Sequence, residues 1–200
     1  MQRRPKPLIP IIVTALLAAI ATVLFFFPRF ALFPGPPTLW LDFSDIPALL
    51  AGIVLGPGYG VAVQLIKNIL GLIFRGMGTT MGLGNLMNFV VGIAFIVPYA
   101  IAIRRGRKKH GRTTGKTLLL AGMAGMVSII VVGLGMNMLV TPLFFRIVLG
   151  RALDFRATWG IIGASTTLNA INGAILTTVG SIFVYLPLRN VLERHLQGRR

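Results

Sequence analysis

The polar side chains best suited to chemistry are amides that lie inside apolar runs. Asn137, Asn169 and Asn172 each occupy such a run, and Asn169 and Asn172 are three residues apart. On a helix, this spacing places both amides on one face. A buried amide needs partners for two N–H groups and one oxygen. The three residues therefore either join helices by hydrogen bonds or line a site for a polar ligand, and three amides on two neighbouring helices favour the ligand site.

A charged side chain also lies inside an apolar run. This side chain is Lys67. Two of the four acidic residues in the chain, Asp42 and Asp45, lie earlier in the sequence. A charge within lipid is usually paired or faces a cavity. We expect Lys67 to pair with Asp42 or Asp45. Three interpretations stay open: an ion pair that only fixes helix packing, direct contact with a ligand, and a lysine that extends to the lipid headgroups.

Residue types that catalyse reactions or bind metals are not suitably placed. His110 and His195 lie in basic segments, so Ser165 has no plausible base. The chain has no cysteine, and its acids and histidines do not cluster as metal ligands do. The run 111–117 resembles a phosphate-binding loop, but His110 stands where that motif requires glycine. We therefore expect no enzyme activity, no ATP hydrolysis by this chain, no metal and no cofactor.

The composition is that of a membrane protein. Of the 200 residues, 55% are hydrophobic and only 12% are charged, with a mean hydropathy of +0.83. A soluble domain of this size exposes too much surface for so few charges. The composition predicts an all-α integral membrane protein that forms a single domain over residues 1–200.

The apolar runs predict six transmembrane helices, since one crossing needs roughly 20 apolar residues. The block 46–74 is broken by the turn 56–60, and its length alone allows one helix or two. The segment 144–159 mixes arginines with apolar residues and is expected along the outer interface. We expect helices at about 8–27, 45–56, 59–75, 85–103, 117–140 and 164–188.

The positions of the basic residues decide how many helices the block 46–74 forms. Lys and Arg total 20 against four acids, giving a net charge of +16. They gather before residue 7, within 104–116 and after residue 188. The positive-inside rule places all three clusters in the cytosol. This requires two helices in the block and puts both termini in the cytosol. The basic excess then needs no nucleic acid to explain it, and no basic face interleaved with aromatic residues points to one.

The loop 28–44 is rich in proline and aromatic residues and lies on the outer side in this topology. Its rings, among them Phe33 and Trp40, either belong to the aromatic belt at the headgroups or form a stiff lid that stacks on a flat ligand. Prolines reduce the entropy that such a lid loses on ordering. The composition leaves both interpretations open.

Several stretches are similar to the riboflavin-specific substrate-binding subunits of energy-coupling factor (ECF) transporters. The most specific stretch is 41–50 (LDFSDIPALL), followed by the turn 56–60 and by 64–68 (QLIKN). The resemblance covers nearly the whole chain and keeps the order of the six helices. Supporting stretches are 84–89 (GNLMNF), 137–142 and 169–173.

The resemblance implies a subunit of the prokaryotic plasma membrane that captures riboflavin from outside for ATP-driven uptake. Its implied partners are a transmembrane coupling subunit and two cytosolic ATPase subunits. In this family the first outer loop closes over the vitamin, and an Ala-x-x-x-Ala pattern, here Ala15 and Ala19, docks on the coupling subunit. The alternatives are an ECF subunit for another vitamin, such as thiamine or pantothenate, and a stand-alone membrane facilitator.

The resemblance also assigns ligand contacts. The family's ligand-binding asparagines correspond to Asn137 and Asn169, and Thr38 is a candidate for the edge of the isoalloxazine ring. Asn172 stands where the family often has lysine, which leaves the contacts to the ribityl chain open. Asn85 stands where the family commonly has glutamate, so no acidic group carries over there. A flat ring and a hydroxylated chain suit aromatic walls and a few amides.

Overall fold

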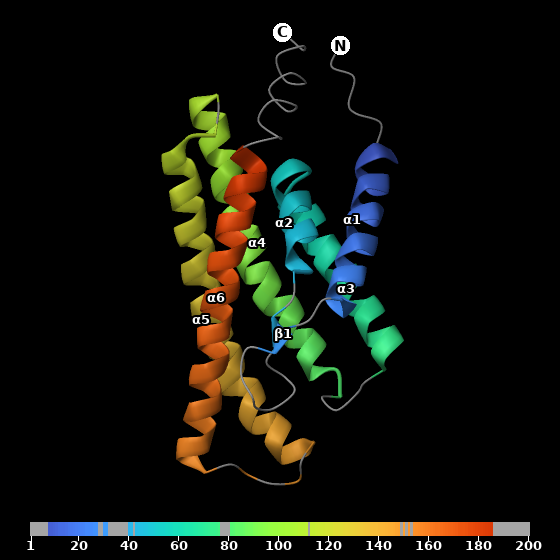
Figure 1. The fold of residues 1–200 in the computed structure, drawn as a ribbon, viewed down its shortest axis with the longest axis vertical. Helices are drawn as coiled ribbons and strands as arrows, with labels where there is room; N and C mark the ends of the chain where they lie inside the picture. The colour runs from blue at the N-terminus through green and yellow to red at the C-terminus, as the bar shows by residue number, and fades with distance from the viewer. Residues whose placement is uncertain are drawn as a thin grey trace.

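The computed structural model (Figure 1) describes residues 8–27, 30–31, 40–41, 43–76, 81–111, 113–148, 150, 152 and 154–185. These residues form six helices and one pair of two-residue strands, so the fold class is all-helical, as predicted. In chain order the elements are α1 (Leu8–Phe26), β1 (Phe30–Ala31), β2 (Trp40–Leu41), α2 (Asp45–Val54), α3 (Pro57–Arg75), α4 (Leu83–His110), α5 (Gly115–Ile147) and α6 (Phe155–Tyr185).

The helices alternate in direction along the long axis of the bundle. The start of α1, the end of α4, the start of α5 and the end of α6 lie at one end, and β1 lies toward the other (Figure 1). Helix α4 packs against α2, α3 and α5, while α6 packs against α5 and α2, and α1 packs against α2 and α3. All six helices contribute fully buried side chains to the core, and the largest of these include Leu49, Phe95, Tyr99, Ile129 and Leu176.

A tight turn at Gly56 separates α2 from α3. Gly56 has a φ of 138°, a backbone conformation that other residues rarely adopt. Pro57, whose φ is already suited to a helix, follows in the first turn of α3. A Cβ at Gly60 would lie only 2.9 Å from the backbone oxygen of Ala48, so glycine is needed where α3 approaches α2. The block 46–74 thus forms two helices, as the charge distribution predicted.

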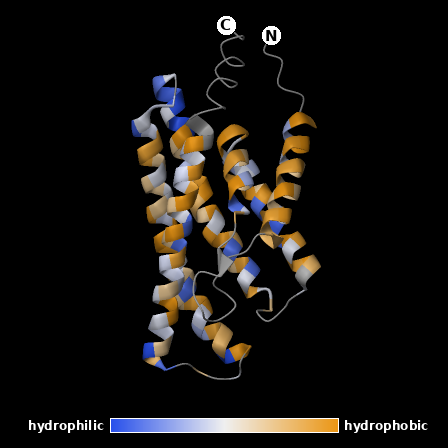
Figure 2. Cartoon of the chain, in the orientation of Figure 1, coloured by the Kyte–Doolittle hydropathy of each residue, from blue (hydrophilic) through white to orange (hydrophobic). Residues whose placement is uncertain are grey.

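Apolar residues predominate along much of the helices (Figure 2), and many large apolar residues are exposed on the outside of the bundle. Leu16 on α1, Ile73 on α3 and Val131 on α5 are each about three-fifths exposed or more. Within the described residues, four helices are long and apolar enough to cross a membrane: α1, residues 57–74 of α3, α4 and α5. Helix α6 has 31 residues but is not among these four, and α2, with 10, is too short to cross alone.

Helix α4 is longer than predicted at its basic end. It continues past residue 103 to His110 and ends at Gly111, which has a left-handed backbone conformation. Arg and Lys are good helix formers, and their charge is favourable near a helix C-terminus. The basic residues therefore end the apolar stretch without ending the helix.

Helices α5 and α6 are also longer than predicted, and they include much of the segment 144–159. Helix α5 continues to Ile147 with Pro142 inside it, and α6 begins at Phe155. Helix α5 bends toward its C-terminal end (Figure 1), where Pro142 removes a backbone hydrogen bond. The segment is thus mostly an extension of two helices, and its place at the outer interface stays a prediction.

The loop 28–44 is described mainly at its two ends. Phe30 pairs with Leu41 and Ala31 pairs with Trp40 in a short antiparallel ladder, so the two ends of the loop are held together. Trp40 is described by its backbone alone, and its predicted ligand contact stays a prediction. Three predicted site residues lie outside the described residues: Phe33, Thr38 and Asp42.

Candidate functional site

A buried ion pair lies where α2 meets α3. Lys67 Nζ is 2.6 Å from Asp45 Oδ1, and Lys67 and Asp45 are 0% and 3% exposed. Lys67 Nζ also donates a 2.9 Å hydrogen bond to Ser44 Oγ and lies 5.3 Å from the centroid of the Phe25 ring. Of the two acids expected as partners, Asp45 makes the contact. Because the lysine is fully buried, it does not extend to the headgroups.

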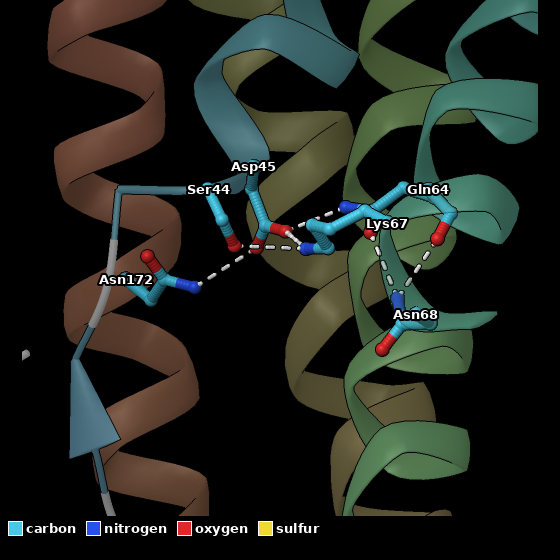
Figure 3. A network of polar contacts seen from close by, with 6 residues as sticks. All are labelled: Ser44, Asp45, Gln64, Lys67, Asn68 and Asn172. Atoms are coloured by element: carbon cyan, nitrogen blue, oxygen red, sulfur yellow. Dashed lines mark hydrogen bonds and ion pairs between the residues drawn. The ribbon is translucent and has the colours of Figure 1, made fainter. Parts of the chain in front are cut away.

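Two further residues complete the hydrogen bonding of the Asp45 carboxylate (Figure 3). Gln64 Nε2 on α3 donates to Oδ1 over 2.5 Å, and Asn172 Nδ2 on α6 makes a long contact of 3.4 Å with Oδ2. This carboxylate therefore links α2, α3 and α6. Removing one partner of a buried ion pair leaves an uncompensated charge, which typically costs about 3–5 kcal/mol.

Asn68 extends the polar network toward α4. Its Nδ2 donates to the backbone oxygen of Gln64 over 2.9 Å, and Asn85 Nδ2 donates to the backbone oxygen of Asn68 over 3.0 Å. Within the described part of the chain, the side-chain oxygens of Asn68 and Asn88 are buried without a hydrogen-bond partner. Each can therefore accept a hydrogen bond from a water molecule or a ligand.

Asn137 and Asn169 lie where α5 approaches α6. Asn137 is 4% exposed, and its Nδ2 donates to the backbone oxygen of Gly133 over 2.8 Å. A Cβ at Gly133 would lie 2.5 Å from Asn169 Nδ2, so the Asn169 amide occupies the space that a side chain would fill. The structure thus brings both predicted amides to Gly133. Asn172, one turn further along α6, contacts Asp45 instead.

The chemistry that this arrangement offers is hydrogen bonding. Its side chains are mainly amides, which both donate and accept. Lys67 and Asp45 neutralise each other, so the region suits an uncharged polar ligand. Among the described residues, no group of three or more His, Cys, Asp or Glu side chains could hold a metal ion.

The sequence predicted no site role for Ser44, Gln64 and Asn68 of the polar network, or for Gly133 beside Asn137. For Gln64 and Asn68 a signal was present, because Gln64 precedes Lys67 by three residues and Asn68 by four, the spacing of one helix face. Gly133 precedes Asn137 by four residues, but nothing along α5 indicates that an amide of α6 lies against it.

Ala15 and Ala19 lie on the exposed side of α1, whereas Ala18 between them is 1% exposed. Small residues on an exposed helix face allow close approach by another helix. The face is therefore open for contact with another membrane protein.

Comparisons with known proteins agree with this architecture. The chain matches the family "ECF transporter, substrate-specific component" over residues 10–189. It is 31% identical over 188 residues to the riboflavin transporter FmnP of Bacillus subtilis (strain 168), covering 92% of this chain and 94% of that protein. It is 33% identical over 185 residues to the riboflavin transporter RibU of Staphylococcus aureus (strain TCH60), covering 92% of each.

A solved structure gives the same result for the fold. It is described as "Structure and mechanism of the S component of a bacterial ECF transporter" and matches with a TM-score of 0.70 at 30% identity, over 94% of this chain and 99% of that one. The six helices and their apolar surface are those of a membrane protein of this kind. The chain therefore belongs to the substrate-specific components of ECF transporters, a family of membrane transport proteins rather than enzymes.

Proposed function

We propose that this chain is the substrate-capture subunit of an ECF transporter and that its substrate is riboflavin. The observation that carries the proposal is the relation to two riboflavin transporters at 31% and 33% identity, each aligned over 92% of this chain. The amide-rich region with an internally neutral ion pair supports it, because riboflavin is uncharged and carries a polar ring edge and several hydroxyls.

In this proposal, the ligand binds beside the amides of α5 and α6. Asn137 and Asn169 contact it directly, and Asn172 contributes from the next turn of α6. The proximity of Asn137 and Asn169 to Gly133 supports a shared role. In the lid, Phe33 and Trp40 stack on the isoalloxazine ring, since flat aromatic ligands stack well on aromatic side chains, and Thr38 contacts the edge of that ring.

The proposed orientation places the basic end of α4 in the cytosol. Arg107, Lys108, Lys109 and His110 form its last turn, at the same end of the bundle as the start of α1 and the end of α6. The positive-inside rule then places both termini in the cytosol and the β1 end outside. The riboflavin site would thus be reached from outside a prokaryotic plasma membrane.

The proposed energy source lies in partner proteins. Two cytosolic ATPase subunits hydrolyse ATP, and a transmembrane coupling subunit transmits the change to this chain. The exposed positions of Ala15 and Ala19 support α1 as the docking helix. This chain contributes no catalytic step and holds riboflavin as cargo, with no cofactor of its own.

A competition experiment tests the choice of vitamin. Purified chain is saturated with riboflavin in detergent, and thiamine or pantothenate is added in excess while riboflavin fluorescence is followed. We expect neither to displace riboflavin. Displacement by either vitamin would favour the alternative of an ECF subunit for that vitamin. A chain that transports riboflavin without ATPase subunits would instead be a stand-alone facilitator.

A further inference from the structure

We propose that Asp45 is a positioning residue that sets the orientation of the Asn172 amide, so that Asn172 presents its oxygen, and not its N–H groups, to the ligand. The inference rests on the proposed function, since it concerns the same site. It assigns Asn172 an acceptor role toward a hydrogen-bond donor of the ligand. It also gives the buried ion pair a role in recognition beyond helix packing.

The first step is the direction of the contact between Asp45 and Asn172. An ionised carboxylate only accepts hydrogen bonds. The Asn172 atom that faces Asp45 Oδ2, 3.4 Å away, is accordingly the amide nitrogen (Figure 3). An amide held by its nitrogen must direct its oxygen elsewhere.

The second step is that Asp45 itself cannot turn away. Its Oδ1 accepts from both Lys67 Nζ at 2.6 Å and Gln64 Nε2 at 2.5 Å, and the residue is only 3% exposed. Lys67 is in turn held by Ser44 Oγ at 2.9 Å. Buried, charge-assisted hydrogen bonds of this kind are strong and geometrically specific. Oδ2 is therefore fixed toward α6.

The third step is that the Asn172 oxygen is available. No described residue donates a hydrogen bond to it, and Asn172 is half-buried rather than closed off. Asn169 lies three residues earlier on the same face of α6. The ligand chemistry that fits a lone amide oxygen is an O–H or N–H donor, and riboflavin offers both in its ribityl hydroxyls and its ring imide.

Asp45→Asn tests the inference because it changes the pattern of donors and acceptors without changing shape. The introduced carboxamide would turn its oxygen to Lys67 and Gln64 and its NH₂ group to Asn172. Two facing donors are unfavourable, so Asn172 would turn over and present N–H groups to the ligand. The readout is selectivity, expressed as two ratios. The first is the affinity for riboflavin divided by the affinity for lumiflavin, which lacks the ribityl hydroxyls. The second is the affinity for riboflavin divided by the affinity for riboflavin methylated at the imide nitrogen.

We expect at least one of these two ratios to fall about tenfold in Asp45→Asn, the loss of one hydrogen bond to the ligand. In the double variant Asp45→Asn with Asn172→Asp, the carboxylate at position 172 accepts a hydrogen bond from the carboxamide at position 45. Its second oxygen can then accept from the ligand, so the selectivity ratio that fell in Asp45→Asn recovers. A role confined to helix packing would not restore selectivity between ligands.

A second double variant guards against misfolding. Asp45→Asn with Lys67→Met leaves no unpaired buried charge, and it keeps the same carboxamide facing Asn172. We expect the same tenfold fall in the ratio. If the folded variants keep both ratios of the wild-type chain, this inference is overturned while riboflavin binding stands. If the wild-type chain binds no riboflavin, the proposed function fails, and this inference fails with it.

Discussion

At the scale of single residues, Gly133 determines where the Asn169 amide can lie. A methyl group at Gly133 would come within 2.5 Å of Asn169 Nδ2, too close for any real contact. The backbone oxygen of Gly133 also accepts a hydrogen bond from Asn137 Nδ2. A glycine with no polar side chain of its own thus sets the geometry of two proposed ligand contacts.

Gly133→Ala should therefore weaken riboflavin binding. The amide of Asn169 must move, and we expect the affinity to fall about tenfold, as for one lost hydrogen bond. Fluorescence titration of the purified variant measures this. Gly135→Ala is the matched control two residues along α5, because nothing lies within 4 Å of its added methyl group. If Gly133→Ala and Gly135→Ala bound riboflavin with equal affinity, Asn169 would not be a ligand contact.

The contacts of single residues could be predicted only where they follow from the sequence along one helix. The ion pair was predicted to within a choice of two acids, because a charge inside an apolar run needs a partner. The contacts of Asp45 with Gln64 and Asn172 were not, because they depend on how helices lie side by side. Spacing along a helix says which residues share a face and nothing about what that face meets.

At the scale of helices, the junction of α2 and α3 positions the polar network. Asp45 begins α2, and Lys67 lies midway along α3. The two helices must approach closely for the pair to form. Gly60 allows this, since a Cβ there would lie 2.9 Å from the backbone oxygen of Ala48 and 2.8 Å from Ile96 Cγ2.

Gly60→Ala should destabilise the protein by about 1–3 kcal/mol, the usual cost of overpacking a core, because a backbone atom cannot yield as a flexible side chain can. Thermal unfolding in detergent, followed by circular dichroism, measures it as a lower Tm. Gly58→Ala in the same helix is the control, as its methyl group meets nothing within 4 Å. An unchanged Tm for Gly60→Ala would mean that α2 and α3 do not pack as described.

Helix number was predictable and helix ends were less so. The lengths of the apolar runs and the positions of the basic clusters gave six helices, including the division of block 46–74. The predicted end of α5 at 140 fell short although the uncharged run continues to Phe145, and α5 passes Pro142 to end at Ile147. The predicted end of α4 at 103 fell short because it marked where the apolar run ends. A helix continues into water as long as its residues favour it, which Arg and Lys do.

At the scale of the whole molecule, our proposal assigns separate roles to the exposed side of α1 and to the amide region. Ala15 and Ala19 face outward from the bundle, away from the buried ion pair. Family membership supplies the partner, because substrate-specific components work with the rest of an ECF transporter. Docking and ligand binding should therefore be separable by mutation.

The double variant Ala15→Trp with Ala19→Trp should abolish riboflavin uptake by cells and leave riboflavin binding by the purified chain unchanged. Bulky side chains on this face prevent another helix from approaching closely. Val127→Trp on α5, where Val127 is 61% exposed, is the control for a bulky residue facing lipid. Uptake that survives the double variant would show that docking occurs elsewhere.

The most direct test of the central claim is a titration of riboflavin with the purified wild-type chain, followed by riboflavin fluorescence. We predict a saturable change in fluorescence that thiamine and pantothenate do not reverse. A chain that is folded, as judged by its helical circular dichroism, and yet leaves riboflavin fluorescence unchanged would contradict the account.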